Sequence, residues 1–342
     1  MVSKLAADPR IDPRIKAIFG AMDMAPQADV ASRKQMLAEQ AAIDPAQAQA
    51  TKAMMDAADN ETIAPKTGLA IRSESIVSAP DGNRINLQII RPDTAERLAC
   101  VYYIHGGGMM TLSCYDGPWR AWGRIIAGFG VCVVMVDFRN CLAPSSVPEV
   151  APFPAGLNDC VSGLKWTHAN AAALNIDPAR IVVAGESGGG NLALATILKL
   201  KQDGDLGLVK GVYALCPYIA GIWPLPQNPS SSENNGIFLN LHNNRGAMAY
   251  GIEELEKRNP LAWPGFATAE DVMGFPPTVI SVNECDPLRD EGVNFYRLLI
   301  ANGVAARCRQ VMGTVHGTEI FSIACPDISG DTASDMARFA KG

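Results

Sequence analysis

From about residue 70 onward, short apolar runs alternate with helix-forming segments along most of the chain. The runs at 71–77 and 85–91, joined by the turn Ala79-Pro80-Asp81-Gly82, predict an antiparallel hairpin. Further strands are expected at 100–104, 131–137, 181–185, 210–216, 278–282 and 305–312, with helices at 118–128, 157–171, 191–201, 288–302 and 332–340. Alternating strands and helices build a mostly parallel sheet covered by helices on both faces, so we predict the α/β class.

Two segments fall outside this alternation. Residues 1 to about 60 are rich in Ala, Met and Gln and predict two or three helices, one of them opened by Asp44 before Pro45. Between Pro217 and about residue 277 the rhythm breaks into an insert rich in Pro, Asn, Ser and Trp. An insert of this size is typical of a functional lid or a second layer. The 342 residues allow one large α/β domain with an accessory piece.

Composition and charge narrow the class of protein. The chain is 48% hydrophobic and 19% charged, which is ordinary for a globular enzyme. Its net charge of −6 argues against a nucleic-acid partner, which favours a basic face. Apolar runs are strand-sized, so no membrane span is expected, and the first ten residues lack the apolar block of a signal peptide.

The nine cysteines are scattered singly along the chain. They form no Cys-x-x-Cys pair and no Cys/His cluster, so neither a disulfide framework nor a metal site is predicted. Cys100, Cys132 and Cys216 lie in apolar runs, where a reduced cysteine packs as a small hydrophobe. We therefore predict a cytoplasmic protein.

The most informative stretch is the apolar run 181–184, followed by Gly185-Glu186-Ser187-Gly188-Gly189 and a helix-forming segment. A Gly-x-Ser-x-Gly turn between a strand and a helix is the nucleophile elbow, which needs small residues at both flanking glycine positions. The turn holds its serine in a strained conformation with the hydroxyl clear of the sheet. Ser187 is thus the predicted nucleophile.

The same stretch contains Gly188, Gly190 and Ala193 at the spacing of a partial dinucleotide-binding fingerprint. That fingerprint normally opens the first βαβ unit, whereas this one lies in mid-chain. The other parts of an acyl-transfer site decide in favour of the elbow.

His105-Gly106-Gly107-Gly108 follows the predicted strand 100–104 directly. Acyl transfer needs backbone N–H groups aimed at the oxygen that becomes an anion, and glycines allow a close approach. A flexible turn would also be rich in glycine, but this run ahead of Gly-x-Ser-x-Gly matches an oxyanion loop. We interpret His105 as a residue that orients this loop.

The general base is predicted by elimination among four histidines. His168 lies in a predicted helix and precedes Ser187, His242 lies in the insert, and His105 is already assigned. His316, in a loop after the last strand, remains and follows the order Ser, acid, His.

The acid is sought in the polar stretch 283–292 that follows the strand 278–282. Asp286 is the best candidate, because it lies just past the strand end with Pro287 beginning the next helix. The competing carboxylates are Glu284, Asp290 and Glu291, the last two in a first helical turn, where acids complement the helix dipole.

Together these motifs resemble the hormone-sensitive-lipase-like carboxylesterases, bacterial family IV, of the α/β-hydrolase fold. The motifs that carry the resemblance are His105-Gly106-Gly107-Gly108, Gly185-Glu186-Ser187-Gly188-Gly189-Gly190, Asp286-Pro287-Leu288-Arg289-Asp290-Glu291-Gly292, His316-Gly317 and Val136-Asp137-Phe138-Arg139. The resemblance covers the chain from about residue 70 to its end.

The resemblance implies Ser187, Asp286 and His316 as a catalytic triad. It also implies a helical cap made of residues 1–60 and the insert 217–260, with catalytic-domain parts at 61–216 and 261–342. No cofactor is implied, the substrates would be short-to-medium acyl esters of uncharged alcohols, and homodimers are common in the family.

Three departures from the family pattern stand out. The elbow reads Glu-Ser-Gly instead of the commoner Asp-Ser-Ala, although Gly188 still offers an N–H, so we expect Gly107, Gly108 and Gly188 as oxyanion donors. The segment 140–150 is longer than usual, which can alter the pocket rim. The N-terminal cap shows little similarity, which puts substrate preference in doubt.

The reaction we expect is ester hydrolysis through an acyl-enzyme. Candidates to line the substrate pocket are Met109, Met110, Tyr115, Ile222 and Trp223, each with core packing as an equal alternative. Rival functions are an amidase, thioesterase or peptidase with the same machinery, a non-catalytic receptor of the same fold, and a nicotinamide-dependent oxidoreductase. The receptors of this fold have lost the catalytic histidine, whereas His316 is present here.

Overall fold

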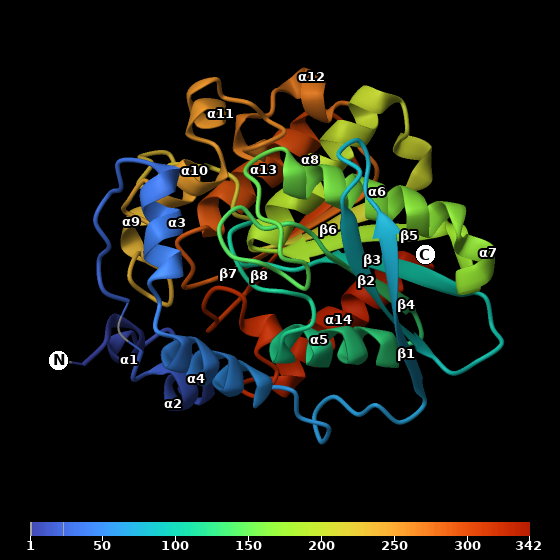
Figure 1. The fold of residues 1–342 in the computed structure, drawn as a ribbon, viewed down its shortest axis with the longest axis horizontal. Helices are drawn as coiled ribbons and strands as arrows, with labels where there is room; N and C mark the ends of the chain where they lie inside the picture. Colours follow the sequence, from blue (N-terminus) through green and yellow to red (C-terminus); the bar gives the residue numbers. More distant parts are fainter. Residues whose placement is uncertain (1, 23) are drawn as a thin grey trace.

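The computed structural model describes residues 2–22 and 24–342, and eight strands within them form one sheet (Figure 1). The strands are β1 (Leu69–Val77), β2 (Arg84–Pro92), β3 (Leu98–Ile104), β4 (Cys132–Asp137), β5 (Ile176–Glu186), β6 (Gly211–Leu215), β7 (Thr278–Asn283) and β8 (Ala306–Val311). Their order is β1-β2-β4-β3-β5-β6-β7-β8. The β1–β2 and β2–β4 pairs are antiparallel and the other pairs are parallel. The predicted α/β class and hairpin are confirmed.

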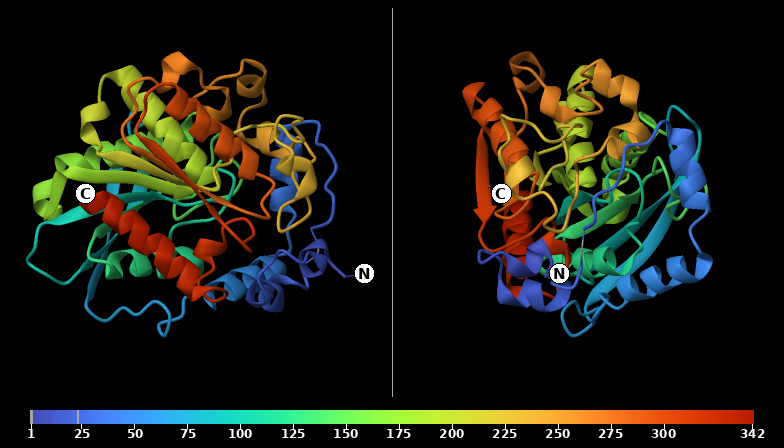
Figure 2. Two further views of the ribbon diagram at one scale, coloured as in Figure 1. Left: turned by 180° about the vertical axis from the view of Figure 1, so that it is seen from behind. Right: turned by 90° about the vertical axis from the view of Figure 1, so that its left-hand side faces the viewer.

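Helices cover both faces of the sheet, as the alternating pattern predicts (Figure 2). One face carries α6 (Ala155–Ala169), α8 (Gly188–Asp203) and α13 (Arg289–Ala301), and the other carries α5 (Gly117–Gly128) and α14 (Pro326–Lys341). Because successive strand residues point to opposite faces, Tyr102 packs in the core under α6 and α8, whereas Tyr103 packs in the core beside α5 and α14. This sandwich fixes the carboxyl ends of the parallel strands, where the site lies.

The N-terminal segment is helical, as predicted, and lies against the insert. Its helices are α1 (Lys4–Ala7), α2 (Pro13–Phe19), α3 (Arg33–Ala41) and α4 (Pro45–Asp56). Helix α4 begins where expected, because the Asp44 carboxylate accepts a hydrogen bond from the Ala46 N–H. Pro45 suits the first helical position, since it has no N–H group that would be left without an acceptor.

The insert holds α9 (Ser230–Glu233), α10 (Arg245–Tyr250), α11 (Ile252–Glu256), the 3-10 turn η2 (Pro264–Phe266) and α12 (Ala269–Val272). Helix α3 lies beside α10 although about two hundred residues separate them (Figure 1). The Val30 N–H donates to Asn244 Oδ1 and the Asn244 amide donates back to the Val30 carbonyl, each at 2.9 Å. The Arg245 guanidinium also pairs with Glu39. Hydrogen bonds and an ion pair thus join the N-terminal segment to the insert, and we call these two segments the cover.

Some short elements and some element starts differ from those that the apolar pattern predicts. The short elements are α7 (Ala171–Leu174) and the 3-10 turns η1 (Leu206–Leu208) and η3 (Thr318–Ile320). Strand β5 begins at Ile176, earlier than its apolar run, because Ile176 pairs with Leu98 across an irregular register. Helix α14 begins at Pro326, before its predicted start, because proline suits the first turn of a helix. None of the helices in the described residues has the length and apolarity needed to cross a bilayer.

Candidate active site

Three side chains from three different loops meet at the carboxyl end of the sheet. Ser187 follows β5, Asp286 follows β7 and His316 follows β8. His316 Nε2 lies 2.8 Å from Ser187 Oγ, and His316 Nδ1 lies 2.8 Å from Asp286 Oδ2. The sequence-predicted nucleophile, base and acid therefore stand in one hydrogen-bonded chain.

The strand–turn–helix at Ser187 has the strain that the Gly-x-Ser-x-Gly pattern predicts. Ser187 has φ 56° and ψ −121°, a conformation that L-residues rarely adopt. A Cβ on Gly185 would lie 2.4 Å from the Gly189 carbonyl oxygen, and one on Gly189 would lie 2.0 Å from that of Ile104. Only glycine fits these two positions, and the tight turn holds Ser187 at the N-terminus of α8.

Asp286 is completely buried and fixed on both oxygens. Its Oδ1 accepts a hydrogen bond from the Leu288 N–H at 2.9 Å, while Oδ2 faces the imidazole. The three alternative carboxylates bind other groups. Glu284 accepts a hydrogen bond from the Gly313 N–H, and Asp290 accepts one from the Ser230 N–H. Glu291 accepts hydrogen bonds from the N–H groups of Ile219 and Ala220 and from the Trp223 indole. Asp286 is the acid that contacts His316.

The protonation of His316 is set by two opposing effects. Burial favours the neutral ring, but the negative charge of Asp286, the neighbouring Cys216 and the hydrogen bond to Asp286 together raise the pKa of His316 well above its ordinary value. The neighbourhood of Asp286 therefore favours the protonated form of the ring.

The predicted oxyanion loop borders the same place. Gly107 and Gly108 have φ of +97° and +63°, in the left-handed region that favours glycine. Within the described residues, no hydrogen-bond acceptor is assigned to either N–H. A Cβ on Gly188 would lie 2.7 Å from the Gly108 nitrogen and 2.6 Å from the Met109 nitrogen, so the loop packs directly on the first residue of α8.

Glu186 is a contact that sequence reasoning does not assign. Its carboxylate accepts hydrogen bonds from the Gly106 N–H at 2.5 Å, the Trp119 indole at 2.7 Å and the Tyr103 hydroxyl at 2.5 Å. Burial raises the pKa of Glu186 to about 7. The only sequence signal is the Glu before Ser187, where the family commonly has Asp; this longer side chain anchors the start of the glycine loop.

His105 stabilises the same loop, as the sequence interpretation expects of it. Its ring stacks on Phe138 with centroids 4.3 Å apart, and its Nδ1 lies 2.9 Å from the Gly106 carbonyl. It is fully buried and does not border the cavity beside Ser187.

A cavity of about 280 Å³ opens beside Ser187 and His316. Its wall is mostly apolar and comes from the glycine loop, the insert and the segment after β8. Besides the glycine loop, Ser187 and His316, the lining includes Met110, Thr111, Leu112, Trp119, Glu186, Tyr218, Phe238, Leu239, Leu241, Gly317, Ile320 and Phe321.

Four of the residues expected in the pocket lie elsewhere, and only Met110 lines this cavity. Met109 is buried beneath the loop, and Tyr115 packs beside α5, where its hydroxyl bonds Ser73 Oγ. Trp223 is buried in an aromatic cluster, and Ile222 borders a separate cavity. Met110 lines the cavity while its neighbour Met109 is buried, so proximity to a motif in the sequence does not tell which side chain faces the cavity.

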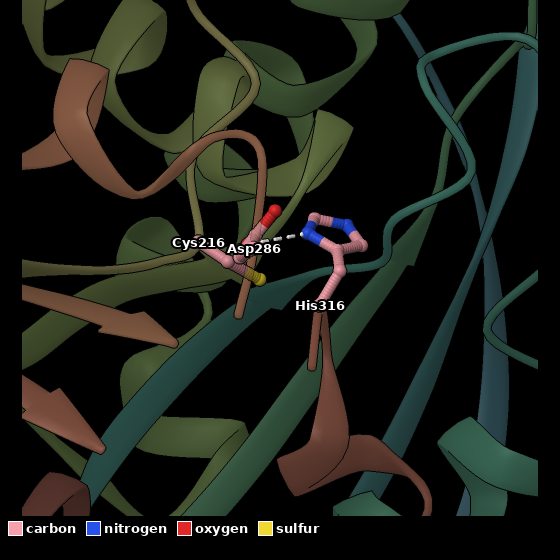
Figure 3. A group of neighbouring side chains, drawn as sticks. All are labelled: Cys216, Asp286 and His316. Carbon is pink, nitrogen blue, oxygen red and sulfur yellow. Dashed lines mark hydrogen bonds and ion pairs between the residues drawn. The ribbon is translucent and has the colours of Figure 1, made fainter. Parts of the chain in front are cut away.

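One group among the described residues has three potential metal ligands close together. The donor atoms of Cys216, Asp286 and His316 lie within 4.8 Å of one another, and Figure 3 shows these side chains converging from the loops after β6, β7 and β8. Asp286 and His316 already hydrogen-bond to each other, and Cys216 is fully buried. The geometry is that of a hydrogen-bonded carboxylate–imidazole pair with a buried cysteine sulfur nearby.

Comparison with known proteins agrees with this picture. A family model described as alpha/beta hydrolase fold matches residues 101–320. Carboxylesterase NlhH from Mycobacterium tuberculosis is 33% identical over 73% of this chain and 76% of its own.

Solved structures agree as well. The structure of esterase Est22 is 64% identical, covers 99% of this chain and all of its own, and superposes with a TM-score of 0.95. A further structure shows Est22 with p-nitrophenol. Brefeldin A esterase, a bacterial homologue of human hormone-sensitive lipase, is 35% identical over 98% of this chain and 94% of its own, with a TM-score of 0.85. The chain therefore belongs to the alpha/beta hydrolase fold family, and its predicted resemblance to the hormone-sensitive-lipase-like esterases is confirmed.

Proposed function

We propose that this carboxylic ester hydrolase is a serine carboxylesterase that cleaves short-to-medium acyl esters through an acyl-enzyme. The observation that carries the proposal is the hydrogen-bonded chain from Ser187 through His316 to buried Asp286, at the wall of an apolar cavity. A nucleophile, a base and a residue that orients the base are what covalent acyl transfer requires.

In the proposed mechanism Ser187 Oγ attacks the ester carbonyl while His316 Nε2 takes its proton. The imidazolium then gives that proton to the departing alcohol, which leaves the acyl group on Ser187. Water, activated by the same nitrogen, hydrolyses the acyl-enzyme. Throughout, Asp286 holds the His316 tautomer whose Nε2 is free to accept a proton, and stabilises the imidazolium.

We propose Gly107, Gly108 and Gly188 as donors to the oxyanion. Three observations support this role. Gly107 and Gly108 have a left-handed backbone, and within the described residues their N–H groups have no acceptor. The glycine loop also packs directly on the start of α8. Removal of one such donor typically costs about 10²–10³-fold in kcat. In this scheme Glu186 and His105 position the loop; Glu186 also borders the cavity, whereas His105 does not.

The proposed acyl-length preference follows from the cavity. Its volume of about 280 Å³ lies at the small end of ligand pockets, which span about 300–1,000 Å³. Phe238, Phe321 and Phe19 meet edge to face with centroids 5.2–5.5 Å apart, and the first two line the cavity. This aromatic cluster limits the length of a bound acyl chain.

Hydrolysis of p-nitrophenyl acetate, butyrate, octanoate and palmitate tests the proposal, and the Est22 structure with p-nitrophenol supports this choice of leaving group. We expect kcat/KM to peak at acetate or butyrate and to fall steeply by palmitate. A wild-type enzyme that hydrolyses none of the four esters, but whose Ser187 reacts with a fluorophosphonate, would indicate that its substrates are amides or thioesters. No hydrolysis and no labelling would contradict the proposal.

Gly188→Ala provides a sharp test of the oxyanion assignment. Alanine is common at this position in the family, but here its Cβ would press on two loop nitrogens at 2.6–2.7 Å. We expect kcat for p-nitrophenyl butyrate to fall by about 10²-fold because the loop must move from the oxyanion position. Gly330→Ala in α14, where a Cβ meets nothing within 4 Å, is the control and should keep full activity. Full activity of Gly188→Ala would show that the glycine loop does not bind the oxyanion.

We propose a cytoplasmic location and a homodimeric state. All nine cysteines are free thiols in the structure and eight are buried, which suits a reducing compartment. Non-reducing gel electrophoresis after extraction under thiol-blocking conditions, together with light scattering, tests both.

A further inference from the structure

A second cavity of about 440 Å³ adjoins the one beside Ser187. The two share Met110, Tyr218, Leu239 and Leu241, so these four side chains stand at their junction. The second cavity is formed where the N-terminal segment 24–27 meets the insert at 239–246. A substrate that reaches Ser187 can therefore extend beneath both parts of the cover.

The described residues that line the second cavity are more polar than those of the first, and the one charged side chain among them is paired. Gln27, Asn240, Asn243 and Arg245 contribute to its wall. The Arg245 guanidinium is paired with Glu39, so the wall suits an uncharged polar group better than an anion. The chemistry of the two cavities together fits an ester with one apolar end and one end that carries oxygen.

Tyr218 is held rigidly at this junction. Its N–H donates to the Ser187 carbonyl at 3.0 Å, and its own carbonyl accepts from the Asn191 amide at 2.9 Å. Its ring stacks on Trp223 at 4.5 Å and meets the edge of Trp263 at 5.6 Å. The side chain is only 6% exposed, and its backbone is tied to the nucleophile itself.

The Tyr218 hydroxyl has no hydrogen-bond partner assigned among residues 2–22 and 24–342. It differs from the hydroxyl of Tyr250, which is buried without a partner in the described part of the chain. Tyr218 borders both cavities, so a ligand or water there can accept a hydrogen bond from its hydroxyl. Burial, with the nearby Glu291 charge, also raises the pKa of Tyr218, which keeps the hydroxyl protonated as a donor.

We propose that Tyr218 is a specificity-determining residue whose hydroxyl donates a hydrogen bond to a second oxygen of the substrate. The preferred substrates are uncharged esters that carry an ether, hydroxyl or carbonyl oxygen a few atoms from the scissile carbonyl and span both cavities. The inference rests on the proposed esterase function and adds to it the chemical class of the substrate.

The test compares wild type with Tyr218→Phe, which keeps the ring packing and removes only the hydroxyl. Two ester pairs of equal length are used: 2-methoxyethyl butyrate against butyl butyrate, and phenyl 3-methoxypropanoate against phenyl pentanoate. The readout is the ratio of kcat/KM for the oxygenated ester to that for its alkyl partner, because differences in intrinsic reactivity cancel between enzyme variants.

We expect Tyr218→Phe to lower this ratio about 2- to 10-fold for at least one pair, the range of a single hydrogen bond. The pair that responds identifies whether the oxygen lies on the alcohol or the acyl side. Tyr250→Phe is the control: Tyr250 packs on the same Trp263 with an unpartnered hydroxyl, but lines neither cavity, and its ratios should match wild type.

Ratios that Tyr218→Phe leaves unchanged for both pairs, in an active enzyme, would overturn this inference and leave the proposed function standing. A wild type inactive on all four esters and on the p-nitrophenyl series would overturn both.

Discussion

Ser187→Ala is expected to lower kcat for p-nitrophenyl butyrate by about 10⁵–10⁶-fold, because the acyl-enzyme can no longer form. The residual rate would come from the oxyanion donors and from substrate binding, which survive the change. The variant should fold normally, since the main-chain bond from the residue-187 N–H to the Leu215 carbonyl is kept and alanine is smaller than serine.

The measurement is p-nitrophenol release by stopped-time assay at high enzyme concentration, with Ser232→Ala as the matched control. Ser232 is exposed in α9, away from the cavity, and its replacement should leave kcat within a factor of two. A Ser187→Ala enzyme that keeps a tenth or more of wild-type activity would mean that another group is the nucleophile.

Asp286→Asn should have the second largest effect, a fall in kcat of about 10⁴-fold. The amide can still accept the Leu288 N–H, so the loop keeps its shape. The amide group that faces His316 Nδ1 is a donor, however, and it favours the tautomer in which Nε2 carries the proton and cannot accept one from Ser187.

The same substitution should shift the pH profile. In wild type the Asp286 charge raises the pKa of His316 well above 6.5, and the base works only when neutral, so kcat/KM should rise with pH through an alkaline-shifted limb. Without that charge, burial lowers the His316 pKa, and the limb should move to lower pH. Glu284→Gln, which alters a nearby carboxylate bonded to the Gly313 N–H, should not move the limb. A pH profile of kcat/KM that Asp286→Asn leaves unshifted would show that Asp286 does not act on the catalytic base.

The parts of the site that could be predicted from sequence are those fixed by local backbone geometry. The elbow at Ser187, and Gly107 in the glycine loop, need glycine because a Cβ there would strike main-chain atoms, so these motifs can be identified from their residues. His316 follows by elimination among the four histidines, and Asp286 from its position just past a strand end, since parallel strands bring their carboxyl ends to one edge of the sheet. The structure brings both residues together at that edge.

The lining of the cavity could not be predicted in this way. Phe238 comes from the insert, where it adopts φ +63°, and it meets Phe19 of α2 and Phe321 after β8. These contacts depend on how the two cover segments pack, for which the sequence carries no local signal. The Glu186 bonds to Gly106 and Trp119 are of the same kind, since they join residues 67 or more positions apart.

The most direct test of the central claim is to trap the covalent intermediate. Wild-type enzyme is mixed with p-nitrophenyl butyrate, quenched in acid within the first turnovers, and mapped by peptide mass spectrometry. The account predicts a burst of p-nitrophenol and one butyryl group on Ser187, absent from Ser187→Ala. Steady release of p-nitrophenol with no acylated peptide, or acylation of a different residue, would contradict it.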